Sequence, residues 1–205
     1  MANPEAFGER YIKAASLCAR LFKVIFFLLL LSSPVVAEVS ETIAYKTYTA
    51  KHKTGTTLLQ TLNSSSPIRH NGGIFHGYTS WYIRWRYEWS NGSGGYCSIT
   101  RNKTTLTVTI TLPRLIASDP KIKSEFSRYL ESLHGHESGH LQIAREAAEK
   151  IDREILSLPP MNSCSLLEQA ANQIGNEILE QARQEERNYD QSTNYGATQG
   201  ALLPR

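Results

Sequence analysis

Residues 133–142, with the sequence LHGHESGHLQ, place three of the chain's six histidines within seven positions. His136 and His140 are four residues apart, so on a helix their rings leave the same face, separated by about 400° of rotation and 6 Å of rise. This spacing lets two imidazole nitrogens reach one metal ion at about 2.0–2.1 Å. We therefore predict a metal site, against the alternative of a polar patch on a solvent-exposed helix.

Glu137 follows the first of these histidines and completes the pattern His-Glu-x-x-His, which is the helix signature of metalloproteases. It lies about 100° further around the helix, so it flanks the ion without having to bind it. A carboxylate in this place can take a proton from a metal-activated water and later deliver it to a leaving amine. His134 lies about 200° from His136, so we expect it to face elsewhere.

A catalytic zinc needs a third protein ligand and one open position for water. The extended metalloprotease pattern would place a glycine and a further ligand after His140, but Ile143 and Glu146 occupy those positions. Carboxylates on the second predicted helix, Glu177 and Glu180, are more simply explained as solvent-facing charges. The remaining option is a residue of the C-terminal segment.

The histidine pair falls within a long helical pattern. Apolar residues recur in steps of three and four, with one gap of ten, at Ile122, Phe126, Tyr129, Leu133, Ile143, Ala147, Ile151 and Ile155. His136 and His140 fill that gap, which places them on the buried face, where imidazoles without partners are costly. Pro120 suits the first turn of this helix, and Pro159 and Pro160 end it near residue 158.

A second helix and a sheet complete the expected fold. Ser165 and Glu168 form a capping-box pattern that opens a helix running to about Arg187, followed by a loop. Residues 81–89 and 105–112 alternate apolar and polar side chains around a glycine-rich turn, which predicts an antiparallel hairpin that ends at Pro113. Residues 41–50 resemble a further strand, and residues 54–66 allow a short helix. We therefore predict a zincin-like α+β fold: an N-terminal antiparallel sheet, then the long His-Glu-x-x-His helix, then a C-terminal helix.

The first 37 residues have the pattern of an export signal, which we expect to be cleaved after Ala37. A basic segment precedes an apolar run at residues 24–31, which is much shorter than the roughly 20 residues that span a bilayer. Residues 38–205 then form one metallopeptidase-like domain with no stable membrane span, secreted or periplasmic. That domain has 18 Lys and Arg against 17 Asp and Glu, so it lacks the excess of positive charge that is typical of a nucleic-acid binder. Cys97 and Cys164 remain, and we expect a disulfide between them in an oxidising compartment.

The chain as a whole resembles a family of bacterial predicted secreted zinc-dependent proteases, catalogued as a domain of unknown function. The segments that carry the resemblance are TSWYIRWRY, HESGH, the two cysteines and the closing YDQSTNYGATQGALLP. Membership implies that His136, Glu137 and His140 are site residues. In the family's closing motif a histidine precedes the glycine and is a candidate third ligand, but here that position is Tyr195. We take Tyr195 as the expected third ligand, with Asp190 in reserve because oxygen ligands also suit zinc.

The sequence therefore predicts an exported zinc-dependent metallopeptidase that acts on a peptide or protein substrate, with Zn²⁺ as cofactor and Glu137 as general base. Its oligomeric state is open. The alternative is a non-catalytic, zinc-stabilised binding module of the cell envelope. A glycan-binding domain that uses the tryptophans of residues 81–89 is a third interpretation, although such a stripe is more often core. His76 and Tyr78 could help to hold an oxyanion, but packed or exposed loop residues are the simpler expectation.

Overall fold

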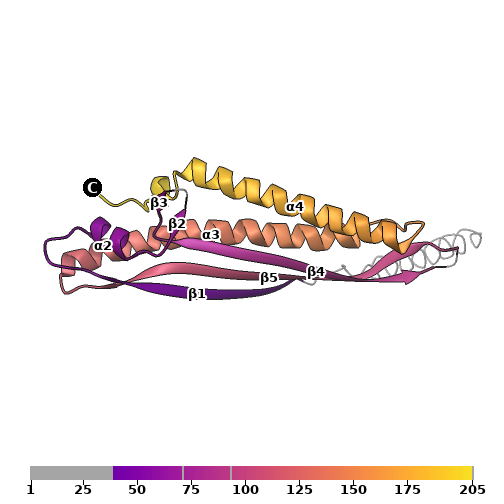
Figure 1. Cartoon of the computed structure of the whole chain (residues 1–205), viewed down its shortest axis with the longest axis horizontal. Helices are drawn as coiled ribbons and strands as arrows, with labels where there is room; N and C mark the ends of the chain where they lie inside the picture. Colours follow the sequence, from indigo (N-terminus) through magenta and orange to yellow (C-terminus); the bar gives the residue numbers. More distant parts are fainter. Residues whose placement is uncertain (1–38, 71, 93, 205) are drawn as a thin grey trace, which may run out of the picture. The chain divides into compact units, whose positions relative to one another are not determined.

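The computed structural model describes residues 39–70, 72–92 and 94–204, and these belong to one compact unit. The expected export signal, residues 1–37, lies outside the described residues. Within the part that is described, no helix is both long and apolar enough to cross a membrane. The α+β class is confirmed: a sheet comes first, and a long helix and a C-terminal helix follow it (Figure 1).

Three long strands form the main sheet in the order β1–β5–β4. β4 (Tyr78–Asn91) and β5 (Cys97–Ile116) are antiparallel, as predicted. β1 (Val39–Lys51) instead runs parallel to β5, so the sheet is mixed and not purely antiparallel. Apolar–polar alternation reports which face of a strand is buried but not the direction of its neighbour, so the sequence does not show this pairing.

β5 runs as one strand of 20 residues through Pro113, where the sequence predicted its end. The first residue of β4, Tyr78, pairs with Thr111, so β4 has no residue opposite Pro113, which pairs only with Tyr48 of β1. A proline lacks a backbone N–H, and it is tolerated where a strand has become an edge. The strand therefore continues for three residues beyond Pro113.

A short connecting segment lies between β1 and β4. It contains α2 (Leu58–Ser65) and a small hairpin of β2 (Arg69–His70) and β3 (Gly73–Ile74). Thr57 caps α2 in a reciprocal capping box with Gln60, so the short helix expected in residues 54–66 is present. The β2–β3 hairpin lies near the C-terminal end of α4 (Figure 1).

α3 (Pro120–Leu156) is a continuous helix of 37 residues that covers one face of the sheet (Figure 1). The Asp119 side chain caps it by accepting a hydrogen bond from the backbone N–H of Lys121. Its buried stripe packs against the inward residues of β5 in a single core, which includes Leu106, Val108, Ile110, Leu133, Ala144, Ala148, Ile151 and Ile155. The two histidines of the motif interrupt this stripe on its buried side, as the periodicity predicted.

α4 (Cys164–Thr193) lies along α3 (Figure 1), and the indole N–H groups of Trp81 and Trp85 of β4 donate hydrogen bonds to it. Its cap is Ser163, not the expected Ser165, and it ends at Thr193, not near Arg187. Trp85 donates a hydrogen bond from Nε1 to Asn172 Oδ1 at 3.1 Å and packs against Gly175. Trp81 and Trp85 are therefore part of the packing of α4, whereas Trp89 is exposed.

A disulfide joins Cys97 at the start of β5 to Cys164 at the start of α4, with 5.0 Å between the Cα atoms. Two backbone hydrogen bonds between Cys97 and Met161 reinforce this junction. The predicted pairing of the two cysteines is confirmed. One end of α4 is thus fixed covalently to the sheet.

Candidate metal centre

The two motif histidines lie side by side on the inner face of α3. His136 and His140 are 5% and 9% exposed, and their ring centroids are 5.0 Å apart. Each ring turns its Nε2 atom toward α4. The i, i+4 geometry expected from the sequence is present, and the rings do not face bulk water.

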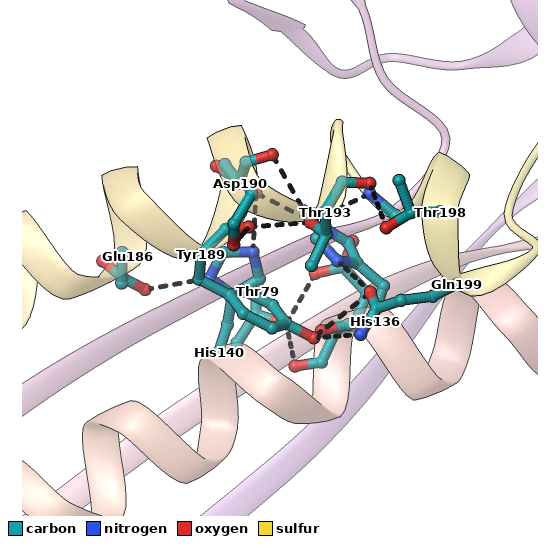
Figure 2. Close-up of polar contacts among 12 residues, drawn as sticks. Thr79, His136, His140, Glu186, Tyr189, Asp190, Thr193, Thr198 and Gln199 are labelled. Carbon is teal, nitrogen blue, oxygen red and sulfur yellow. Dashed lines mark hydrogen bonds and ion pairs between the residues drawn. The ribbon is translucent and has the colours of Figure 1, made fainter.

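Asp190 of α4 brings a carboxylate to the same point (Figure 2). Its Oδ1 atom lies 3.3 Å from His136 Nε2 and 3.1 Å from His140 Nε2. The three potential ligand atoms all lie within 4.8 Å of one another. In a tetrahedral zinc site the ligand atoms lie roughly 3.4 Å apart, because each is about 2.0–2.2 Å from the ion. Two imidazoles and a carboxylate on this scale fit a metal ion and leave room for a fourth ligand.

Two outer residues fix the orientation of the rings. The carboxamide oxygen of Gln199 lies 3.0 Å from His136 Nδ1, and Glu186 Oε1 lies 3.4 Å from His140 Nδ1. Both oxygens are acceptors, so with a metal ion at the shared point each Nδ1 would donate its proton to them and each Nε2 would present its lone pair to the ion. Trp81 donates to the same Glu186 oxygen at 2.7 Å and holds it in place.

The charges of the site favour a cation at this point. Burial alone would raise the pKa of Asp190, but its hydrogen bonds to His136 and His140 outweigh that effect and hold the pKa well below its usual range. Burial would lower the pKa of His140, but Asp190 and Glu186 raise it to about 9. The carboxylates therefore stabilise positive charge on or between the imidazoles, and a metal ion or a proton can supply it.

Glu137 lies beside the ligand group and is only 4% exposed. Thr79 of β4 donates a hydrogen bond to Glu137 Oε2 at 2.7 Å. Gly77 lets the carboxyl group fit, because a Cβ atom there would lie 3.0 Å from Glu137 Cδ. Burial raises the pKa of Glu137, partly opposed by the Thr79 hydrogen bond. A buried carboxyl group with a raised pKa is suited to proton transfer.

Tyr189 joins α4 to the histidine helix. Its ring stacks on His136 at a centroid distance of 5.1 Å and an interplanar angle of 10°. Its hydroxyl donates to the His136 carbonyl oxygen at 3.2 Å. Gly139, inside the motif, makes room for this ring, since a Cβ atom there would lie 2.7 Å from Tyr189 Cε1 and closer still to the hydroxyl.

The other candidate ligands have different surroundings. Tyr195 follows α4, is 53% exposed, and its ring lies 5.5 Å from that of Phe75. Glu146 and Glu177 are exposed and accept hydrogen bonds from neighbouring glutamines. Glu180 is likewise exposed, and Arg183 and Arg187 bind it. Asp190, the reserve candidate, is the residue that lies with the two histidines.

The other residues named from the sequence are more peripheral. His134 is exposed and stacks on Tyr45, so it faces away from the metal centre. Both ring nitrogens of His76 are occupied, Nδ1 by Tyr129 at 2.7 Å and Nε2 by Asn63 at 2.8 Å. Tyr78 is exposed at the edge of the site. His76 is therefore a packed residue with no free donor for an oxyanion.

A cleft of about 860 Å³ opens onto the candidate ligands. Its walls are the end of α4, the β2–β3 hairpin, the start of β4 and the C-terminal segment after the 3₁₀ turn η1 (Ala197–Gln199). His136, Glu137, His140 and Asp190 all line it. The site is thus accessible to a ligand larger than water.

Sequence reasoning did not identify Thr79, Glu186, Tyr189 and Gln199. One signal was available for α4, because Ile178 and Ala182 continue in steps of four to Glu186 and Asp190. The Gly- and Asn-rich composition of residues 188–205 predicts a loop, with Asp190 outside the helix, although polar residues also interrupt the buried stripe of α3 where the histidines lie. A buried stripe that becomes polar on two adjacent helices is the pattern of an internal polar site.

Comparison with known proteins gives a family but no activity. No curated protein and no solved structure matches the chain. Residues 45–196, which include the two histidines, Glu137 and Asp190, match the family described as "Bacterial protein of unknown function (DUF922)". The chain therefore belongs to the bacterial family of unknown function DUF922.

Proposed function

We propose that this protein is an exported, zinc-dependent metallopeptidase with His136, His140 and Asp190 as its metal ligands. The observation that carries the proposal is the convergence of both imidazole Nε2 atoms on the Asp190 carboxylate, beside a buried Glu137, at the base of a cleft. Two histidines and one carboxylate, with a fourth position left open, are a ligand set that is found in catalytic zinc sites. A bound zinc ion would supply Lewis acidity, which polarises water and a substrate carbonyl.

The other residues of the site would transfer the proton and orient the groups that take part. Glu137 accepts a proton from the attacking water and returns it to the leaving amine, for which its raised pKa is suited. Thr79 keeps the Glu137 carboxyl group directed by its hydrogen bond. Gln199 and Glu186 keep the two imidazoles in the tautomer that presents Nε2.

The surroundings of the site fit an extended peptide. β4 is at one edge of the three-stranded sheet, and its first residues, Tyr78 and Thr79, line the cleft. A strand edge beside a reactive centre can pair with a substrate backbone, as in β-augmentation. The disulfide and the N-terminal sequence pattern both fit an oxidising, extracytoplasmic compartment.

The test combines metal content with hydrolysis. Purified protein should hold one zinc ion per chain, and Asp190→Asn should lose it, whereas Tyr195→Phe should retain it. Glu137→Gln should retain zinc and abolish cleavage of a casein or peptide-library substrate. Glu146→Gln, an exposed glutamate on the same helix, is the matched control and should cleave normally.

Two results would redirect the assignment. Zinc loss in Tyr195→Phe but not in Asp190→Asn would restore Tyr195 as the third ligand. Stoichiometric zinc that raises the melting temperature, with no cleavage by wild type or by Glu146→Gln, would favour the zinc-stabilised binding module.

A further inference from the structure

Large apolar side chains are exposed together in the cleft. Among the described residues, Ile74, Tyr78, Tyr195 and Leu202 are large hydrophobic residues that are exposed and also line this one concavity. Leu202 is 69% exposed. Single exposed apolar residues are ordinary, but a cluster of them in a concave site indicates a binding surface.

Two aromatic side chains that line the cleft, Phe75 and Tyr195, belong to segments that pack against the candidate site residues. Phe75 and Tyr195 face each other with ring centroids 5.5 Å apart. Phe75 is two residues before Gly77, which packs against Glu137, and Tyr195 is directly before Gly196, which packs against the His136 ring. Both rings line the cleft that His136, Glu137 and the other candidate site residues also line.

The backbone of Tyr195 is strained. Its φ is +52°, in the left-handed region that bulky residues avoid, and its neighbours Asn194 and Gly196 also have positive φ. A left-handed conformation is unfavourable for a residue other than glycine, because its Cβ atom lies too close to a carbonyl oxygen. Such strain persists where the surroundings impose it and is concentrated at binding and catalytic sites.

The arginines that line the cleft are already bound to groups of the protein, so they do not call for an anionic ligand. Arg183 and Arg187 of α4 line the cleft, but both bind Glu180, at 3.4 Å and 3.1 Å. The guanidinium group of Arg69 is bonded to backbone carbonyl oxygens of its own segment. These charged groups already have partners, whereas the apolar side chains of Ile74, Tyr195 and Leu202 are exposed to water.

We propose that Ile74, Phe75, Tyr195 and Leu202 form an apolar subsite that binds a large aliphatic or aromatic side chain of a peptide whose backbone lies at the metal centre. This inference rests on the proposed peptidase function and adds a substrate specificity to it. The subsite selects the substrate residue that lies next to the peptide bond to be cleaved. It also gives Tyr195 a role as a wall of the subsite.

The experiment measures binding separately from cleavage. Zinc-loaded Glu137→Gln protein is titrated into fluorescein-labelled dodecapeptides of Gly, Ser and Ala that differ in one central residue: Phe, Leu, Ala or Asp. Fluorescence anisotropy should give at least about tenfold tighter binding for Phe and Leu than for Ala, because the subsite buries most of the added apolar surface. The Asp peptide should bind no better than the Ala peptide.

Variants assign the preference to the subsite. In the Glu137→Gln background, Tyr195→Ser and Leu202→Ser should each reduce the preference for Phe to within about threefold of Ala, whereas Tyr195→Phe should keep it. Tyr82→Ser is the matched control, because this tyrosine is equally exposed but does not line the cleft, and it should change nothing. If Tyr195→Ser fails to fold by circular dichroism, Leu202→Ser, in the C-terminal segment, decides the question.

Equal affinity for all four peptides, no binding of any of them, or an unchanged preference in both serine variants would overturn the subsite. Cleavage by the wild type is measured in parallel with the same peptides. A binding preference without cleavage would refute the peptidase function and retain the subsite. Cleavage that ignores the central residue would refute the subsite and retain the peptidase function.

Discussion

Replacing each of the two glycines of HGHESGH by alanine should change the stability of the protein in opposite directions. A Cβ atom on Gly135 would meet nothing within 4 Å, whereas one on Gly139 would lie 2.7 Å from Tyr189 Cε1. Both glycines are inside α3, where alanine is favoured over glycine by about 1 kcal/mol. Gly135→Ala should therefore stabilise the protein by up to about 1 kcal/mol.

Gly139→Ala must displace the Tyr189 ring. Ordinary carbon–carbon contact is about 3.5 Å, so Cε1 has to retreat by roughly 0.8 Å and the hydroxyl by more. Overpacking of this kind costs about 1–3 kcal/mol, which exceeds the gain in helix propensity, so we expect a net loss of about 0–2 kcal/mol. Tyr189 is adjacent to Asp190, so the same shift moves a ligand, and zinc affinity should fall by about 10–100-fold.

Urea denaturation of the two variants measures the stabilities, and competition with a chromophoric chelator measures the zinc affinities. The comparison is internal, since both changes are Gly→Ala in one helix, four residues apart. If Gly139→Ala matched Gly135→Ala in both stability and zinc affinity, the argument that Gly139 admits Tyr189 and thereby positions Asp190 would be refuted.

Three further outcomes follow from the structure. Burial, with a smaller contribution from Arg69, lowers the pKa of His76 to about 4 from an unfolded value near 6.5. Between these two pH values the unfolded state binds more protons than the folded state, so the free energy of unfolding should fall as the pH drops from about 6.5 to about 4. The fall should be at most about 3 kcal/mol, and less where solvent screens the ring. His76→Gln should remove this part of the pH dependence in metal-free protein, measured by urea denaturation. Replacing Cys97 and Cys164 together by alanine should lower the free energy of unfolding by about 2–4 kcal/mol, and a loss below 1 kcal/mol in oxidised protein would contradict the structural role of the disulfide. Glu186→Gln should weaken zinc binding by about 10–100-fold while Glu185→Gln, its exposed neighbour, leaves it unchanged; equal affinities would show that Glu186 does not orient His140.

The parts of the fold that follow from local periodicity could be predicted from the sequence. The alternation in β4 and β5 and the stripe of α3 identified these elements, and the i, i+4 spacing placed His136 and His140 on the buried face. The disulfide followed from the export pattern, since only two of the three cysteines lie after the expected cleavage site. These inferences depend on residues close in sequence or on a pairing with a single possible partner.

Features that depend on distant contacts could not be predicted. The parallel direction of β1 depends on its pairing with β5 more than 60 residues away, and the passage of β5 through Pro113 depends on where β4 begins. Residues 188–193, the end of α4, were predicted as part of a loop because residues 188–205 are rich in Gly and Asn. They remain helical because Tyr189 and Asp190 contact α3, and single-helix propensity does not include that contact.

α4 is anchored at its first residue by the disulfide and supplies Asp190 near its last turn. At 1.5 Å per residue, its 30 residues make a rod of about 45 Å, so a tilt of only 1–2° about the anchored end would displace the far end by roughly an ångström. Metal–ligand distances hold to within about 0.2 Å, so a displacement of this size would break the ligand geometry. The contact of Trp85 with Gly175 of α4 therefore helps to set the position of Asp190, so the geometry of the candidate metal centre depends partly on packing far from its proposed ligands.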